Sequence, residues 1–257
     1  MEKEMMSMHT ILEVENLSLE TKEKKVLVSD VSFSVGAGES MGLVGESGSG
    51  KTLTLRSIIS LLPQGIIKAS GTISCGKSCA MIFQDPVRSL DPLCPVVGQL
   101  AEVVYYRQGL SRKASRTKAL ELLELLGLSE TLNKEDHYPY QLSGGQCQRV
   151  VIAMALACKP GILLCDEPTT ALDVTVQKQI LEIIGKLQKE LNFAVVLVTH
   201  NLAIASAMCE KLCVMKSGRI VEQGDTSKIL VNPQNSYTQM LISSVLPLPD
   251  FERSDGV

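Results

Sequence analysis

The stretch Gly45-Glu46-Ser47-Gly48-Ser49-Gly50-Lys51-Thr52 decides the fold of this chain of 257 residues. It matches the pattern G-x-x-x-x-G-K-[ST] in full. Met41–Val44, directly before it, is short and apolar like a buried strand, and Leu53–Ile59, directly after it, has the composition of a helix. Strand, glycine-rich loop and helix are the context that this motif requires. A glycine-rich turn with a chance lysine is therefore the weaker interpretation.

The chemistry of this stretch is that of a polyphosphate-binding loop. Glycines let the backbone wrap closely around phosphate groups. Successive N–H groups, together with the N-terminus of the new helix, then point at the negatively charged oxygens. Lys51 is expected to reach the β- and γ-phosphates of a nucleotide, and the Thr52 hydroxyl is expected to ligate Mg²⁺.

Length and composition indicate a globular chain with a substantial core, either one large domain or two small ones. The net charge is −3, so the chain has no overall positive charge that would attract nucleic acid. The longest apolar run, Val150–Cys158, is shorter than the roughly 20 residues that a bilayer span needs. The N-terminus carries acidic residues and no apolar signal core, so we expect a cytoplasmic location.

The chain contains 8 cysteines. Without a signal peptide, disulfides are not expected. Cys75 with Cys79, and Cys209 with Cys213, are spaced like metal-ligand pairs. However, Cys213 falls in an apolar strand and Cys209 at a helix end, which favours small core residues over a metal or cluster site.

Apolar–polar alternation in Ile11–Leu19 and Val31–Val35 predicts a small antiparallel sheet at the start of the chain. Between Val87 and Gln141 continuous strand patterns vanish. Gln99–Tyr106 and Lys113–Leu126 show helical spacing instead, and Gly127 ends the second of these. This part of the chain is predicted to be a helical insertion.

After the insertion, strands and helices alternate again. Gly161–Cys165 and Ala194–Thr199 are continuous apolar strands, and Val174–Leu191 between them has one apolar helical face. Lys211–Lys216 and Arg219–Glu222 predict a terminal hairpin. The alternation indicates an α/β fold with a parallel sheet covered on both faces.

An acidic pair, Asp166 and Glu167, follows the apolar run Ile162–Cys165. Acids at the carboxyl end of a strand in an open α/β sheet lie beside the ligand crevice. Asp166 is expected to hold Mg²⁺ directly or through water, and Glu167 to polarise the attacking water. Surface acids often follow strands, so this pair alone is weak evidence for a site. Together with the phosphate-binding loop it becomes strong evidence.

The segment Leu142-Ser143-Gly144-Gly145-Gln146 forms a second candidate anion site. Ser143 is a plausible N-cap, and the two glycines expose N–H groups at the positive end of a helix. An ordinary capped helix start is the alternative. Because a single nucleotide does not obviously need both loops from one subunit, we hypothesise a head-to-tail pair in which each copy lends this segment to the other's nucleotide.

On these residues the chain resembles the ATP-hydrolysing subunits of ABC transporters over nearly its whole length. Gly45–Thr52 matches the Walker A motif, and Leu142–Gln146 matches the ABC signature. Asp166 and Glu167 match Walker B and its catalytic glutamate. The resemblance implies a RecA-like P-loop NTPase core with an N-terminal antiparallel β-sheet and an inserted α-helical subdomain.

The same resemblance implies roles for residues that would not indicate a function by themselves. Gln84 matches the Q-loop glutamine, Ala171–Asp173 the D-loop, and His200 the switch histidine that contacts the γ-phosphate. With ATP and Mg²⁺ as cofactors, the implied catalytic residues are Glu167, His200, Gln84 and Lys51. The implied metal ligands are Thr52, Gln84 and Asp166. The implied nucleotide-binding residues are Gly45, Glu46, Ser47, Gly48, Ser49, Gly50, Lys51, Thr52, Ser143, Gly144, Gly145, Gln146 and Asp173.

The expected organisation follows from these motifs. Residues 1–86 carry the first sheet and the first part of the core, residues 87–149 the helical subdomain, residues 150–225 the second part of the core, and residues 226–257 a C-terminal helix and tail. The expected partners are a second cassette, with a heterodimer favoured, and two membrane-spanning permease subunits. An extracellular binding protein would act indirectly. These partners imply the cytoplasmic face of the membrane.

The finer resemblance is to the peptide/nickel import subfamily, through Phe83–Pro92, Ile152–Leu156, Asp166–Gln177 and Asn232–Gln239. Such importers take up oligopeptides, dipeptides, nickel or metal–chelator complexes. Oligopeptide members often carry a longer, cysteine-containing C-terminal extension, whereas this chain stops soon after Pro249. That difference favours the nickel or metal–chelator branch.

Two departures from the family pattern are visible. No aromatic residue lies between Leu19 and Ser32 to stack on adenine, and Cys147 follows the signature glutamine where a basic residue is common. Two rival functions fit the sequence less well. A soluble cassette acting on nucleic acid or the ribosome usually has coiled-coil arms or two cassettes. A P-loop kinase would not explain the signature segment or His200.

Overall fold

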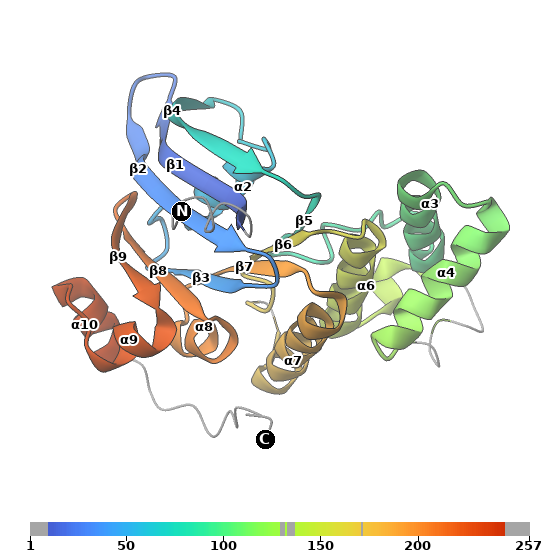
Figure 1. Ribbon diagram of the computed structural model, residues 1–257. Helices are drawn as coiled ribbons and strands as arrows, with labels where there is room; N and C mark the ends of the chain where they lie inside the picture. Colours follow the sequence, from blue (N-terminus) through green and yellow to red (C-terminus); the bar gives the residue numbers. More distant parts are fainter. Residues whose placement is uncertain (1–9, 129–131, 133–136, 171, 245–257) are drawn as a thin grey trace. The chain divides into compact units, whose positions relative to one another are not determined.

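The computed structural model shown in Figure 1 describes residues 10–128, 132, 137–170 and 172–244. The chain divides into two units: the first runs up to Lys77 and resumes at Phe193, and the second is Ser78–Asn192. The predicted tail from Pro247 onward and residue Ala171 of the predicted D-loop lie outside the described residues.

The predicted antiparallel sheet at the start of the chain is confirmed in the first unit. Strands β1 (Thr10–Thr21), β2 (Val26–Gly36) and β4 (Ile66–Cys75) pair antiparallel in the order β2-β1-β4. The alternating side chains Leu12, Val14, Leu17 and Leu19 of β1 are fully or almost fully buried. They form the core beneath this sheet, and their burial explains the alternation of apolar and polar residues in the sequence.

Strand β4 was not predicted. Most of its side chains are exposed, so it lacks a clear apolar face. Its pairing with β1 also shifts register between Glu15 and Ser18. Gly71 lies at this irregularity with φ 92°, and a Cβ there would come 2.6 Å from the Asn16 carbonyl oxygen. A bulge of this kind destroys the period of two on which strand prediction depends.

The second sheet of this unit carries the predicted apolar strands. Strand β3 (Ser40–Val44) pairs parallel with β7 (Ala194–Thr199) and with β8 (Lys211–Lys216). Strand β9 (Arg219–Asp225) closes the predicted hairpin antiparallel to β8. Every residue of β3 and β7 is buried, as expected for continuous apolar strands inside a parallel sheet.

Helices of the first unit pack against these strands. Helix α2 (Lys51–Ile58) contacts β7 and β4, and α8 (Leu202–Met208) contacts β3 and β7. Helix α9 (Thr226–Val231) contacts β8 and β9 beside α8, and α10 (Ser236–Ser243) follows it (Figure 1).

The second unit confirms the predicted helical insertion. Helices α3 (Val96–Gln108), α4 (Arg112–Leu125) and α6 (Gly144–Ala157) pack on one another (Figure 1). A 3₁₀ turn spans Pro139–Gln141. Helix α6 also contacts β5 (Cys79–Ile82), which is paired parallel with β6 (Ile162–Asp166). Helix α7 (Val174–Leu191) has the predicted bounds.

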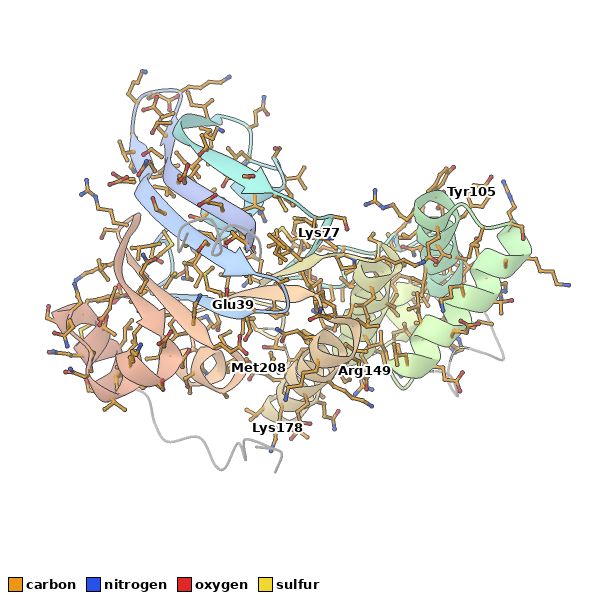
Figure 2. The ribbon with its side chains drawn as sticks, in the orientation of Figure 1. Glu39, Lys77, Tyr105, Arg149, Lys178 and Met208 are labelled. Carbon is orange, nitrogen blue, oxygen red and sulfur yellow. The ribbon has the colours of Figure 1, made fainter. Side chains whose placement is uncertain are left out.

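Arg149, labelled in Figure 2, joins the helices of this unit. One guanidinium nitrogen donates to the Leu126 carbonyl at 3.0 Å, after the end of α4, and the other donates to the Gln179 amide oxygen on α7 at 3.0 Å. Because α6 begins with the signature segment, these bonds hold the helix that presents it.

The cysteines predicted to be core residues are buried: Cys209 is 4% exposed and Cys213 is 3% exposed. Burial raises the pKa of Cys213 and of Cys165 to about 12, so neither thiol ionises at neutral pH. Both therefore act as small apolar side chains.

Across the residues that the structure describes, no helix combines the length and the apolar character needed to cross a membrane.

Candidate functional site

The phosphate-binding loop, Gly45–Thr52, connects β3 to α2 in the first unit. Gly45 has φ 152°, and a Cβ there would come 2.1 Å from the Met215 carbonyl oxygen. Gly50, with φ 102°, is the N-cap of α2. Only glycine fits these two positions, because residues with a side chain rarely adopt such φ angles. In addition, there is no room for a side chain at Gly45. The spacing of the motif is thus a steric requirement.

Lys51 folds back over this loop. Its ammonium group donates to the Gly45 carbonyl at 2.7 Å and to the Glu46 carbonyl at 2.8 Å, and the residue is 5% exposed. A buried cation thus lies where the N-terminus of α2 adds its positive partial charge. Thr52, half-buried in the first turn, follows it. This combination is an anion-binding site suited to a polyphosphate.

The loop is also held from outside its own sequence. The Gly218 N–H, in the β8–β9 turn, donates to the Ser49 carbonyl at 3.0 Å. The Glu46 N–H donates to the Tyr237 hydroxyl of α10 at 3.0 Å. Sequence reasoning did not assign these contacts, because they join segments far apart in the chain. The resemblance noted for Asn232–Gln239 was the one signal that pointed to this region.

His200 lies beside the loop. Val44 pairs with Thr199 in the parallel register of β3 and β7, so the residue after each strand lies at the same sheet edge. His200 is exposed there, and Asn201 caps α8 by accepting from the Ala203 and Ile204 N–H groups. The predicted contact of His200 with a γ-phosphate stays a prediction.

In the second unit, the structure brings Gln84 and Glu167 together. Ile82 of β5 pairs with Cys165 of β6, so the residues that follow meet at one edge. The Gln84 amide nitrogen donates to a Glu167 carboxylate oxygen at 3.4 Å. Asp166, the last residue of β6, is 2% exposed. Gln84 and Glu167 are thus in contact, and Asp166 directly precedes Glu167 at the end of β6.

Glu167 is held in a special conformation. Its φ of 47° is positive, which is uncommon for a residue other than glycine and costs conformational energy. The Thr170 hydroxyl donates to its carboxylate at 2.8 Å. The Gln84 and Thr170 contacts fix the direction of the carboxylate, as a general base requires.

The signature segment Leu142–Gln146 begins α6 with a capping box. The Ser143 hydroxyl accepts from the Gln146 N–H at 3.3 Å, and the Gln146 side chain accepts from the Ser143 N–H at 2.9 Å. The predicted N-cap is therefore confirmed. Ser143 and Gly144 are exposed, so this helix end is open to a ligand from solvent.

Gly145 permits the close approach of α6 to α7. A Cβ on it would come 2.6 Å from a methyl group of Val176, in the first turn of α7. Asp173 caps α7, since its carboxylate accepts from the Val176 N–H at 3.0 Å. The structure thus gives Asp173 a capping role, and its predicted contact with nucleotide remains a prediction.

Cys147, the departure noted after the signature glutamine, is fully buried, and its thiol lies 3.5 Å from the Pro139 carbonyl. Burial raises the pKa of this thiol. The Cys147 side chain thus faces the core rather than the exposed end of α6.

The predicted magnesium ligands are all oxygen donors: the Thr52 hydroxyl in the first unit, and the Gln84 amide and Asp166 carboxylate in the second. Mg²⁺ prefers a few protein oxygens together with substrate phosphates and water. Each of these three donors is therefore of a type that Mg²⁺ accepts, and their shared role stays a prediction. In addition, the described residues contain no cluster of three or more His, Cys, Asp or Glu side chains that could hold a metal by themselves.

Fold and site define a P-loop nucleotide hydrolase. The family described as ABC transporter matches residues 28–170 of the chain. The dipeptide transport ATP-binding protein DppD of Haemophilus influenzae is 41% identical over 94% of this chain and 78% of its own length. The chain therefore belongs to the ABC transporter family and is one of its ATP-hydrolysing cassettes.

Two further proteins extend this comparison. The uncharacterized ABC transporter ATP-binding protein YejF of Escherichia coli is 41% identical over 94% of this chain, which spans 50% of that relative. The ATP-binding cassette MJ0796, solved as a dimer in a post-hydrolysis state with ADP and Pi, has a TM-score of 0.71 and 28% identity. That match covers 84% of this chain and 98% of the other.

The contact between Gly145 and Val176 gives a direct test of the packing beneath the signature segment. Gly145→Ala is expected to destabilise the chain by about 1–3 kcal/mol, because the new methyl group overpacks the contact. In a Val176→Ala background the same change should cost clearly less, since the obstructing methyl is absent. Urea unfolding of the wild type, the two single variants and the double variant measures this coupling.

The matched control is Gly98→Ala on α3, where an added Cβ meets no atom within 4 Å. That change should be neutral or slightly stabilising. If Gly145→Ala lowered the free energy of unfolding no more than Gly98→Ala, the result would contradict the close packing of α6 on α7.

Proposed function

We propose that this chain is the motor subunit of an ABC importer and that the Gly45–Thr52 loop binds the phosphates of the ATP that it hydrolyses. The observation that carries the proposal is the buried Lys51 ammonium, folded into a glycine loop at the N-terminus of α2. The loop N–H groups and Lys51 hold the phosphates, and they neutralise the charge that develops during phosphoryl transfer.

Glu167 orients the attacking water and accepts its proton. The carboxylate is already fixed by Gln84 and Thr170, so little reorganisation is needed when ATP binds. His200 contacts the γ-phosphate from the sheet edge at which the loop begins. Mg²⁺, when bound through Thr52, Asp166 and Gln84, would supply further charge neutralisation at the phosphates.

The signature segment is proposed to act on the nucleotide of a second cassette. Ser143 and Gly144 are exposed at a helix N-terminus, a suitable surface for the γ-phosphate of another subunit. The dimeric state described for the MJ0796 cassette supports such pairing. A heterodimer with a different cassette remains our preferred form, and Asp173 is proposed to lie at the same junction.

The cargo is proposed to be a short peptide. DppD is named a dipeptide transport protein, and a relative from Pectobacterium atrosepticum is named a glutathione import protein. These names support peptides more than the nickel or metal–chelator complexes expected from the sequence, and nickel uptake stays a prediction. The chain spans 50% of YejF and 42% of the glutathione importer, so the full assembly is proposed by analogy.

Two membrane-spanning permeases and an extracellular binding protein complete the proposed assembly, with this chain on the cytoplasmic face. Binding energy closes the cassette pair on ATP, and hydrolysis reopens it. The helical insertion and Gln84 would transmit this motion to the permeases. A soluble cassette acting on nucleic acid or the ribosome gains no support from relatives whose names describe transport.

The first test concerns pairing. Glu167→Gln keeps the shape of the side chain but removes the base, so hydrolysis should fall by about 10²–10⁴-fold and bound ATP should persist. Sedimentation equilibrium of this variant, alone and mixed with a second cassette, should then find a two-chain species in at least one sample with Mg-ATP and single chains without it. Adding Lys51→Ala removes the phosphate ligand, and this double variant should stay single in both conditions.

A second cassette that joins Glu167→Gln only in the presence of ATP would support the heterodimer. Single chains in all mixtures, despite bound ATP, would contradict the proposed pairing.

The second test concerns cargo. Membranes containing the chain with its permeases and binding protein should hydrolyse ATP several-fold faster when dipeptides are added, because cargo-loaded binding protein favours the closed cassette pair. Glu167→Gln provides the blank, and Glu182→Gln, an exposed carboxylate paired with Lys178 on α7, provides the matched control.

Stimulation by Ni²⁺ or a nickel–chelator complex, without stimulation by peptides, would overturn the proposed cargo. Phosphate release that no cargo alters, and that is equal without membranes, would contradict the transport function.

A further inference from the structure

The C-terminal helix α10 reaches the phosphate-binding loop through one side chain. The Tyr237 hydroxyl accepts a hydrogen bond from the Glu46 N–H at 3.0 Å, across a separation of 191 residues. Tyr237 is 3% exposed, so this contact lies inside the protein. The donor is a backbone group of the loop itself, which ties the course of the loop to α10.

Hydrogen bonds of the residues just before Tyr237 fix the start of α10. The Glu222 carboxylate of β9 accepts from the Gln234 N–H at 2.8 Å and from the Asn235 N–H at 3.1 Å. The Asn235 side chain then accepts from the Tyr237 N–H at 2.9 Å and begins the helix. Two backbone donors bound to one carboxylate make a specific attachment, so Tyr237 is held in place rather than merely packed.

The ring of Tyr237 is also oriented. The Lys216 ammonium lies 4.6 Å from the ring centroid, within the range of a cation–π contact. Lys216 is the last residue of β8 and comes directly before the turn whose Gly218 N–H donates to the Ser49 carbonyl. The β8–β9 hairpin and α10 therefore hold the loop from two sides.

The phenol stays neutral in this position. Burial raises the pKa of Tyr237 above its ordinary value, and the Glu46 carboxylate raises it further, although the bond from the Glu46 N–H lowers it. A neutral hydroxyl can accept from the loop without placing negative charge beside a site that must attract phosphate. A carboxylate in the same place would weaken anion binding.

We propose that Tyr237 is a positioning residue for nucleotide binding. Its hydroxyl fixes the Glu46 peptide, and through it the conformation in which the remaining loop N–H groups meet the phosphates. It touches no reacting atom. This inference rests on the proposed function in taking ATP as the ligand of the loop. The Glu46 N–H is committed to Tyr237, so it faces α10 rather than the bound phosphates.

Tyr237→Phe tests the proposal because it removes one oxygen and keeps the ring that packs against Lys216. The loop should lose order, so hydrogen exchange of the backbone amides of residues 45–52, measured without nucleotide, should accelerate while other segments stay unchanged. The Kd for the fluorescent analogue mant-ATP should rise about 2- to 10-fold, the effect of one lost hydrogen bond.

Steady-state kinetics should separate positioning from catalysis. The KM for ATP should rise with the Kd, while kcat should change less than about twofold, because Tyr237 acts only through the loop. Tyr140→Phe is the matched control, since Tyr140 is 72% exposed in the other unit. Wild-type exchange and affinity are expected from it.

Unchanged exchange and Kd in Tyr237→Phe would overturn the proposal. Faster exchange throughout the chain with a lower unfolding midpoint would also overturn it, by showing a packing role alone. If the wild-type chain failed to bind mant-ATP, the proposed function would fail, yet the exchange experiment would still report whether Tyr237 orders the loop.

Discussion

The contact on which the rest of the site depends is the passage of the chain at Gly45 beside the Met215 carbonyl. A side chain at Gly45 would come within 2.1 Å of that oxygen. Strands β3 and β8 are neighbours in the sheet, so the end of β8 forms a wall against which the loop turns. The loop turns away from this strand end toward α2, and its backbone N–H groups come together at the positive N-terminus of that helix. The glycines are thus set by sheet packing as much as by the ligand.

The chemistry is divided between the two units. The first unit carries the phosphate-binding loop, Lys51 and His200, while the second carries Gln84, Asp166, Glu167 and the signature segment. Each group is ordered by bonds inside its own unit, such as Thr170 to Glu167 and Gly218 to Ser49. The local geometry of each group is therefore set by its own unit.

Much of this arrangement could be predicted from the sequence because the signals are local. Helix α7 repeats an apolar face, and β7 is a continuous apolar run, so their bounds were predicted correctly. The non-local features were missed: β4 is exposed and bulged at Gly71, and Tyr237 meets Glu46 only after folding. The capping role of Asp173 was not predicted either, because the family resemblance implied a contact with nucleotide instead.

The most direct test of the central claim is calorimetric titration of the purified chain with Mg-ATP. We expect saturable binding of one nucleotide per chain, and a loss of affinity of about 100-fold or more in Lys51→Ala, because a buried ammonium that meets the phosphates is removed. Both proteins should unfold at similar temperatures. Equal affinity in the two would contradict the account, because ATP would then bind somewhere other than the Gly45–Thr52 loop.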